Sequence, residues 1–245
     1  MYGLRDSWAY PDGGWDMARK IVIAIDGPSG SGKSTVGRLL ARRLGYRYLD
    51  TGAMYRIAAL MAKERSVPID DEEGLAGVCS GMEISFFQKG DEIKTFCNGR
   101  DVSEAIRKPE ISGLASQISA KKAVRNVLVE MQRKMGVGGG IVAEGRDIGT
   151  VVYSGAELKF YLDATPEERG QRRFRELVKK GLRVSLEETI DDMKRRDRRD
   201  RKREVSPLRK AEDALVIDST HMNVEEVVGD MLEKARRRIS KEGSS

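Results

Sequence analysis

The feature that most restricts the fold of this chain is a glycine-rich segment, GPSGSGKST, at residues 27–35. The apolar run KIVIAID precedes it at residues 20–26 and predicts a strand buried on both faces of a parallel sheet. The segment VGRLLARRL follows it and predicts an amphipathic helix, because its apolar residues recur at helical spacing. Strand, glycine loop and helix therefore follow one another directly.

This segment fits the phosphate-binding pattern GxxxxGK[ST], in which backbone amides and a helix N-terminus surround phosphate oxygens. Lys33 is expected to reach the terminal phosphates, and Ser34 is expected to ligate Mg²⁺. The pattern alone also occurs by chance, but here it stands between a buried strand and an amphipathic helix. We therefore predict that the loop binds a nucleoside triphosphate. The expected binding residues are Gly27, Pro28, Ser29, Gly30, Ser31, Gly32, Lys33, Ser34 and Thr35.

Further strands and helices alternate along the chain, which favours a parallel α/β sheet. The other apolar runs that predict strands are residues 46–50, 140–144, 158–163 and 214–218. Helix starts with a capping residue and a reciprocal glutamate are predicted at Thr165, Ser185 and Asn223. Residues 82–87 and 93–96 interrupt the alternation and predict an antiparallel hairpin, with another short strand near residues 100–102.

The composition excludes several classes of protein. No run approaches the roughly 20 apolar residues of a membrane span, and the N-terminus lacks the apolar core of a secretory signal, so we expect a cytoplasmic protein. Cys79 and Cys97 are too few for a disulfide framework and are expected to be reduced and structural. The only histidine, His221, excludes sites that need several imidazoles.

Residues 1–16, MYGLRDSWAYPDGGWD, show neither a helical nor a strand period, and we expect a disordered extension there. A docking peptide that uses Trp8 and Trp15 is the alternative. Residues 17–245 are expected to form a single domain.

Two arginine-bearing segments follow predicted strands of the sheet. The segment DTGAMYR begins at residue 50, and EGRDIGT begins at residue 144. Both should open at the carboxyl edge of the sheet, where the phosphate loop also lies. Thr51 can cap the next helix, which places Arg56 on its second turn. Either arginine alone could be a surface residue, but together Arg56 and Arg146 indicate a binding site for an anionic acceptor.

The run RRDRRDRKR at residues 195–203 carries a net charge of +5, against +6 for the whole chain. If a helix runs from Ser185 to about Arg203, one of its faces carries Arg196, Arg199, Asp200 and Arg203. Such a face suits a mobile lid that neutralises a transferring phosphoryl group. A nucleic-acid track is disfavoured, because carboxylates stand among the cations and no aromatic residue is interleaved for base stacking.

In order and spacing, the segments IDGPSGSGKST, YLDTGAMYR, SQISAKKAVR, EGRDIGTVV, KRRDRRDRKREVSPL and ALVIDST resemble the bacterial cytidylate (CMP) kinase family. The resemblance covers residues 20 to about 238. It implies an α/β P-loop kinase fold with a five-stranded parallel sheet flanked by helices. An antiparallel insert in the monophosphate-binding region, about residues 51–137, and a helical lid, about residues 170–206, complete that fold.

The resemblance also implies transfer of the γ-phosphoryl group of ATP to CMP or dCMP with Mg²⁺, giving ADP and CDP or dCDP. It implies that the residues holding the sugar and phosphate of CMP are Thr51, Arg56, Arg146, Asp200 and Arg203. The residues that read the cytosine would be Ser116, Arg125 and Asp147. Those that stabilise the transferring group would be Lys33, Arg146, Arg196 and Arg203. We expect a monomer with no nucleic-acid or membrane partner.

Cytosine carries an exocyclic amine that uracil lacks, and Asp147 can accept a hydrogen bond from it. Discrimination against UMP should therefore amount to roughly 4 kcal/mol or more. Thr51 stands where many members of the family have serine, which keeps the hydroxyl group. Glu144 stands where some have aspartate, so its role toward Mg²⁺ is open. The helix after residue 165 carries three arginines whose contact with ATP is also open, namely Arg169, Arg172 and Arg173.

Two other functions are alternatives. One is a P-loop kinase for another small acceptor, of the UMP/AMP or shikimate type; shikimate kinases share a similar GKSTVGRLLARRLG opening. The other is an ATP-dependent nucleic-acid-binding module, whose affinity would fall steeply with salt.

Overall fold

The computed structural model describes residues 20–89 and 92–242. These residues divide into two compact units. The insert unit consists of residues 51–132, and the P-loop unit consists of the described residues before and after that segment. The expected extension at residues 1–16 lies outside the described residues.

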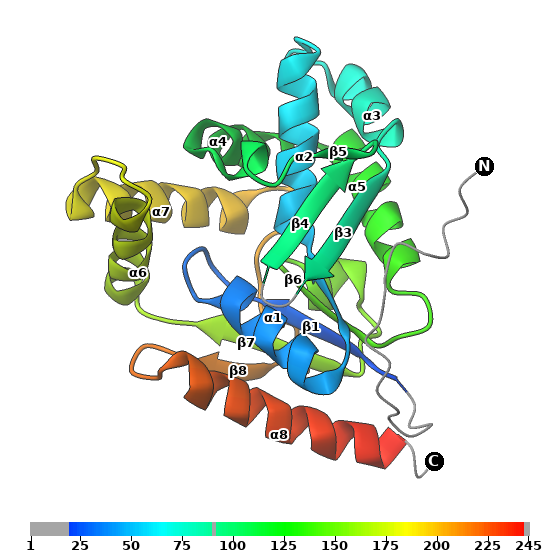
Figure 1. Cartoon of the computed structure of the whole chain (residues 1–245), viewed down its shortest axis with the longest axis vertical. Coiled ribbons are helices and arrows are strands. Elements are labelled where there is room, and N and C mark those ends of the chain that lie inside the picture. The colour runs from blue at the N-terminus through cyan, green and yellow to red at the C-terminus, as the bar shows by residue number, and fades with distance from the viewer. Residues whose placement is uncertain (1–19, 90–91, 243–245) are drawn as a thin grey trace. The chain divides into compact units, whose positions relative to one another are not determined.

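The P-loop unit is built on a parallel sheet with the strand order β2-β6-β1-β7-β8 (Figure 1). Its strands are β1 (Val22–Asp26), β2 (Arg47–Asp50), β6 (Ile141–Gly145), β7 (Leu158–Asp163) and β8 (Leu215–Asp218). The predicted five-stranded parallel sheet is therefore confirmed, with small shifts at the strand ends. The inner strands β1 and β6 are almost completely buried, as a short apolar run predicts for a central parallel strand that is covered on both faces.

The centre of this sheet positions the glycine-rich loop. Strand β1 lies between β6 and β7, and its residues Ile23, Ala24 and Ile25 have no exposed surface. In the register of the sheet, Asp26 at the end of β1 lies opposite Gly145 at the end of β6. The loops that follow β1 and β6 therefore leave the same edge of the sheet from neighbouring strands, as the sequence predicted.

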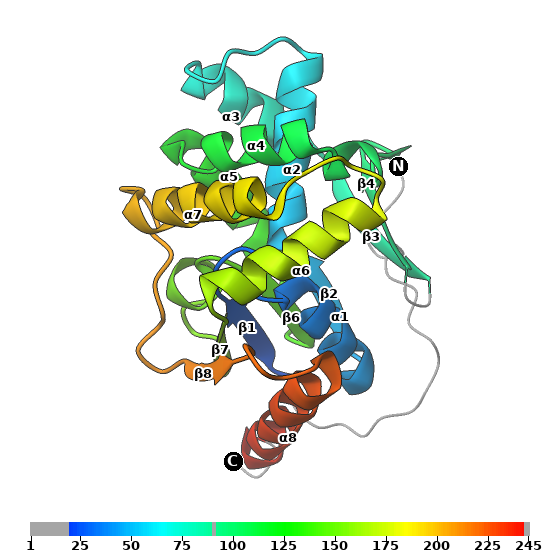
Figure 2. The same ribbon diagram turned by 90° about the vertical axis from the view of Figure 1, so that its left-hand side faces the viewer.

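Four long helices belong wholly to the P-loop unit: α1 (Lys33–Leu44), α6 (Pro166–Lys179), α7 (Leu186–Lys202) and α8 (Val224–Glu242). Helix α1 packs on β1, β2 and β6, and α8 packs against α1 (Figure 1). Helices α6 and α7 pack against each other and form the region expected to be the lid (Figure 2).

The predicted capping box is confirmed at the N-termini of α7 and α8. At the N-terminus of α6 the capping residue is confirmed, but the reciprocal glutamate is not. Ser185 and Glu188 form the reciprocal capping box of α7, and Asn223 and Glu226 exchange the equivalent hydrogen bonds before α8. Thr165 accepts a hydrogen bond from the Glu168 amide, but the Glu168 carboxylate pairs with Arg172 instead. The amide of Thr165 donates to Thr220 Oγ1, a partner that only the tertiary fold brings near.

The insert unit contains helices α2 (Thr51–Glu64), α3 (Glu72–Ser80) and α4 (Pro109–Ile118), and α2 packs against both of the others. Its antiparallel sheet has strands β3 (Ile84–Lys89), β4 (Glu92–Cys97) and β5 (Arg100–Asp101), which confirms the predicted hairpin and third strand. Helix α5 (Lys122–Met135) begins in this unit and ends in the P-loop unit. None of the described helices is long and apolar enough to cross a bilayer.

Both cysteines are free and buried, as predicted. Burial raises the pKa of the Cys79 thiol to about 12, so this thiol is protonated near neutral pH. A protonated, buried thiol is a poor nucleophile, which agrees with a structural role for Cys79.

Candidate active site

The glycine-rich loop after β1 has a backbone that requires glycine. Gly27, Gly30 and Gly32 have φ angles of +152°, +75° and +94°. A Cβ atom on Gly27 would also lie 2.0 Å from the carbonyl oxygen of Leu162. Gly32 precedes the first residue of α1, which begins at Lys33, so the loop leads directly into the positive end of a helix. Ser34 and Thr35, on the first turn, are exposed.

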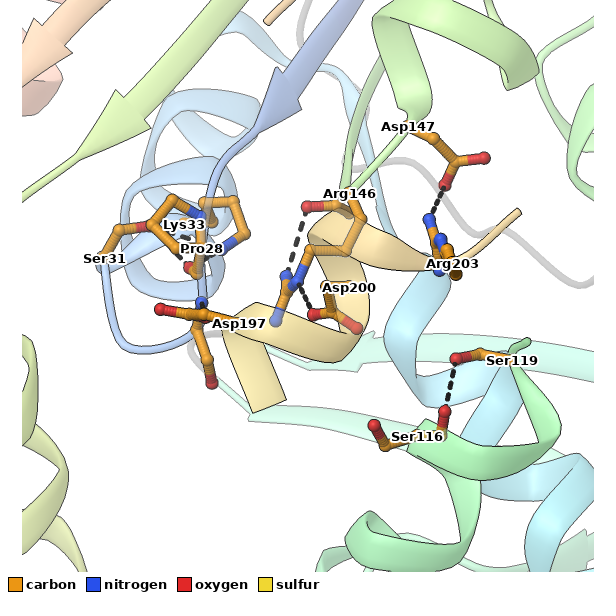
Figure 3. A network of polar contacts seen from close by, with 12 residues as sticks. Pro28, Ser31, Lys33, Ser116, Ser119, Arg146, Asp147, Asp197, Asp200 and Arg203 are labelled. Atoms are coloured by element: carbon orange, nitrogen blue, oxygen red, sulfur yellow. Dashed lines mark hydrogen bonds and ion pairs between the residues drawn. The ribbon is translucent and has the colours of Figure 1, made fainter. Parts of the chain in front are cut away.

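Lys33 is buried in this loop, with only 5% of its surface exposed. Its Nζ atom donates to the carbonyl oxygen of Pro28 at 2.6 Å and to Ser31 Oγ at 3.2 Å (Figure 3). Burial and then repulsion from Arg146 lower the pKa of Lys33 to about 7, and Arg196 adds to the repulsion. Three predicted site residues, Lys33, Arg146 and Arg196, therefore act on one another electrostatically.

A hydroxyl and a carboxylate lie together beside this loop. Ser34 Oγ donates to Glu144 Oε1 at 2.6 Å, and the Tyr48 hydroxyl donates to the same oxygen at 3.0 Å. Glu144 is buried at the end of β6, opposite Asp50 on β2. Burial and the charge of Asp50 raise the pKa of Glu144, and Lys33 opposes that shift. These oxygen donors next to a phosphate-binding loop fit a hard cation such as Mg²⁺.

Arg146 follows β6 and joins this edge of the sheet to helix α7. Its Nε atom donates to Asp200 Oδ2 at 2.8 Å, and the two side chains are 18% and 7% exposed (Figure 3). Burial works against the charged form of Asp200, but Arg146, Arg196 and Arg203 together hold the pKa of this carboxyl below its ordinary value. One buried carboxylate therefore binds Arg146 directly and interacts electrostatically with two further guanidinium groups of the same unit.

Asp147 and Arg203 form a second contact between the same segments. Arg203 directly follows α7 as its C-cap residue, and its Nη2 atom lies 3.4 Å from Asp147 Oδ1 (Figure 3). Each of the two side chains is 6% exposed. Arg203 also donates to the carbonyl oxygen of Ser206. The structure thus brings together the P-loop residues and the predicted residues Arg146, Asp147, Arg196, Asp200 and Arg203 within the P-loop unit.

The prediction for the inward face of α7 was wrong at one residue. Arg199 is exposed, whereas Asp197 is buried and pairs with Arg169 at 2.5 Å. The same pair holds Ser29, because the Ser29 amide donates to Asp197 Oδ1 and Arg169 donates to the Ser29 carbonyl oxygen. The signal that could have found Asp197 is helical spacing, since it lies one turn after the buried Met193.

The three arginines of α6 have different surroundings. Arg169 is buried against the P-loop at Ser29, and Arg172 donates to the side chain and carbonyl oxygen of Ser219. Arg173 pairs with Glu176 on its own helix. Of the three, Arg169 alone makes a direct contact with the P-loop among the hydrogen bonds of the described residues.

The insert unit holds the other predicted site residues. Helix α2 begins at the buried Thr51 and carries the half-buried Arg56 on its second turn. Arg125 is 2% exposed, donates to the Ser119 carbonyl oxygen at 3.2 Å and lies 5.5 Å from the centre of the Tyr55 ring.

Ser116 and Ser119 lie at the end of α4, where Ser119 Oγ donates to the Ser116 carbonyl oxygen at 3.0 Å (Figure 3). Ser116 Oγ is buried and makes no hydrogen bond within the described residues. A buried hydroxyl without such a partner costs free energy unless something else bonds to it. The convergence expected of Arg56 and Arg146 involves both units and stays a prediction.

Comparisons with known proteins agree with this geometry. A family model described as cytidylate kinase matches residues 23–237. The chain is 51% identical to a cytidylate kinase of Citrifermentans bemidjiense over 220 residues, which are 90% of this chain and 94% of that protein. It is also 51% identical to a cytidylate kinase of Syntrophotalea carbinolica over 234 residues, 94% of this chain and 100% of that protein.

A crystal structure of an uncharacterized protein from Eubacterium ventriosum ATCC 27560 is similar in fold alone, with a TM-score of 0.51 and 12% identity. That match covers 89% of this chain and 99% of the other. The family model and both relatives match most of the chain, and the chain therefore belongs to the cytidylate kinase family.

Proposed function

We propose that the protein transfers the γ-phosphoryl group of ATP to CMP or dCMP, giving ADP and CDP or dCDP. The observation that carries this proposal is the cluster of Lys33, Arg146 and Arg196, whose charges oppose one another beside the P-loop. Such a cluster is favourable once anionic phosphates lie within it. The acceptor is itself an anion, so alignment and charge compensation can supply most of the catalysis without a nucleophilic side chain.

The family resemblance gives each predicted residue a role in this reaction. The P-loop residues Gly27 to Thr35 would hold the phosphates of ATP, and Arg196 and Arg203 would neutralise charge on the transferring group. Thr51 and Arg56, with Arg146 and Asp200, would hold the sugar and phosphate of CMP. Ser116, Arg125 and Asp147 would read the cytosine. The buried Ser116 hydroxyl supports this assignment, because a base edge would supply a hydrogen-bonding partner for it.

Mg²⁺ fits the pair formed by Ser34 and Glu144, which would hold the ion through the hydroxyl oxygen and through the carboxylate or a bound water. When bound, the ion would neutralise charge on the ATP phosphates. Replacing Glu144 with glutamine should raise the Mg²⁺ concentration for half-maximal activity by about tenfold or more. The measurement is a Mg²⁺ titration of initial rates at saturating CMP.

Tyr48→Phe is the matched control, because it removes the other hydrogen bond to Glu144 Oε1 and leaves the carboxylate in place. We expect it to shift the titration by less than about threefold. An unchanged Mg²⁺ dependence in Glu144→Gln would show that Glu144 does not serve the ion.

The experiment that tests the function is an acceptor panel. Initial rates of ADP formation would be measured with CMP, dCMP, UMP, AMP and shikimate. We expect kcat/KM for CMP or dCMP to exceed that for UMP by about 10³-fold, because Asp147 would lose its partner when the amine is absent. Equal rates with UMP or AMP would reject the assignment of the base, and activity with shikimate alone would reject the acceptor class.

We further infer that the protein works in the cytoplasm as a monomer and binds no nucleic acid. Two free cysteines are compatible with a reducing compartment. In the basic run of α7, Arg195 pairs with Asp192 of the same helix, so part of the charge of this run is already balanced within the protein. Binding to single-stranded DNA that weakens steeply with salt would contradict this inference.

A further inference from the structure

The turn that follows Arg146 and Asp147 is held by a residue of a different strand. This turn, η2 (Ile148–Val152), begins directly after Asp147. Asp26, the last residue of β1, accepts hydrogen bonds from the Ile148 amide at 2.8 Å and from the Gly149 amide at 2.7 Å. Each bond uses a different oxygen of the carboxylate, and Asp26 is only 3% exposed. A buried carboxylate that accepts two short hydrogen bonds from backbone amides holds the loop in one conformation.

Asp26 thus caps the η2 turn, a role that the side chain of Asp147 could fill by itself. An aspartate in the position before a helical turn commonly accepts the first free amides with its own side chain. Asp147 occupies that position, but its side chain makes no capping hydrogen bond. Its carboxylate is directed instead toward Arg203, at 3.4 Å. Because Asp26 satisfies the amides, the side chain of Asp147 can face the ligand-binding side of the loop.

Asp26 is also charged under assay conditions. Burial raises the pKa of Asp26 to about 6, and the Asp147 charge adds to this, whereas the Gly149 and Ile148 amides and Lys33 oppose it. The side chains of Tyr161 and Lys159 also lie near this carboxyl group. At about pH 8 both oxygens therefore act as acceptors.

We propose that Asp26 is a positioning residue for acceptor recognition, which holds the amides of Ile148 and Gly149 so that Asp147 presents its carboxylate to the base. This inference rests on the proposed function. It adds a residue that lies beside the P-loop in the sequence but acts on the acceptor, through Asp147, rather than on ATP.

The test is Asp26→Asn, assayed at about pH 8 with ATP, CMP and UMP as the varied substrates. Asparagine would turn an N–H group toward one of the two amides, so one bond would be lost. We expect the selectivity for CMP over UMP, as a ratio of kcat/KM values, to fall by about tenfold or more, while KM for ATP changes by less than about threefold. Asp230→Asn, at a half-buried position of α8 far along the chain from Asp26, is the matched control and should leave all these constants within about twofold.

A second variant keeps the test decisive if Asp26→Asn does not fold. A Cβ atom on Gly149 would lie 3.4 Å from Asp26 Oδ2 and 3.0 Å from Lys159 Cδ. Gly149→Ala should therefore weaken the hydrogen bonds from the Ile148 and Gly149 amides to Asp26, while the Asp26 carboxylate stays in place. It should shift the selectivity in the same direction, by about threefold. Equal losses for CMP and UMP, or a rise in KM for ATP alone, would overturn the proposal. A wild-type protein that does not phosphorylate CMP would reject the proposed function instead.

Discussion

Arg146→Ala should lower kcat/KM for CMP phosphorylation by about 10⁴-fold, the range found when a cation that stabilises a transferring phosphoryl group is lost. The guanidinium of Arg146 is held by Asp200 and lies close enough to Lys33 to lower its pKa. Under the proposed function, Arg146 would lie where charge on the donor and acceptor phosphates meets. Arg146→Lys should retain more activity than Arg146→Ala and still lose about 10²-fold, because lysine keeps the charge and loses the planar fork.

The stability of Arg146→Ala should depend on pH in a defined direction. Despite burial, Arg146 and its neighbours hold the pKa of Asp200 below the ordinary value of 3.8. The stability from this pairing is present above that value and is lost as pH falls through the lower pKa of the folded state. Arg146→Ala should therefore be less stable than wild type near neutral pH, and the difference should shrink in acid.

Coupled assays and urea unfolding of the same samples would measure both effects. Arg198→Ala is the matched control, since Arg198 is an exposed arginine of α7. It should keep activity within about twofold of wild type. Similar losses in Arg146→Ala and Arg198→Ala would contradict a special role for Arg146.

Lys33→Met should lower kcat/KM by at least about 10³-fold, because the cation that reaches the terminal phosphates is removed. The nucleotide-free variant should nevertheless be more stable than wild type at about pH 6. The pKa of Lys33 is about 7 in the folded protein against an ordinary value of 10.5, so the unfolded chain binds more protons between these values. Wild-type stability therefore rises with pH across that interval, and the cost of the buried charge is fully present below about pH 7.

The gain in stability of Lys33→Met should consequently be largest at about pH 6 and decline toward about pH 10. Urea unfolding at several pH values without nucleotide measures it. Lys194→Met, at an exposed position of α7, should show no such trend. A Lys33→Met variant that is equally destabilised at all pH values would show that the hydrogen bonds of Lys33 to Pro28 and Ser31 outweigh its burial.

The features that the sequence predicts best are those that depend on neighbours along the chain. A continuous apolar run such as residues 20–26 predicts a central parallel strand, because both faces of that strand are covered. The glycine-rich loop could be predicted because positive φ angles at Gly27 and Gly32, and a close backbone contact at Gly27, leave few alternatives to glycine. The capping boxes at Ser185 and Asn223 are equally local.

The features that were missed depend on contacts between distant segments. Thr165 bonds to Thr220 across 55 positions of the chain, and Asp197 meets Arg169 and Ser29 only after α6 and α7 pack. Helical spacing from Arg196 suggested Arg199 for the inward face of α7, but a buried arginine there would have needed a carboxylate partner. Asp26 was read only as the end of a strand, because its two amide partners lie more than a hundred residues later.

Two cations of the P-loop unit, Lys33 and Arg146, already hold oxygen atoms of the protein itself. Lys33 binds a carbonyl oxygen of Pro28, and Arg146 binds a carboxylate oxygen of Asp200. A phosphate oxygen that entered this place would replace an oxygen atom of the protein, so the free energy of the new hydrogen bonds would be partly offset by the loss of the internal ones. The affinity would then be lower than the new contacts alone suggest, which would favour release of product over tight retention of a nucleotide.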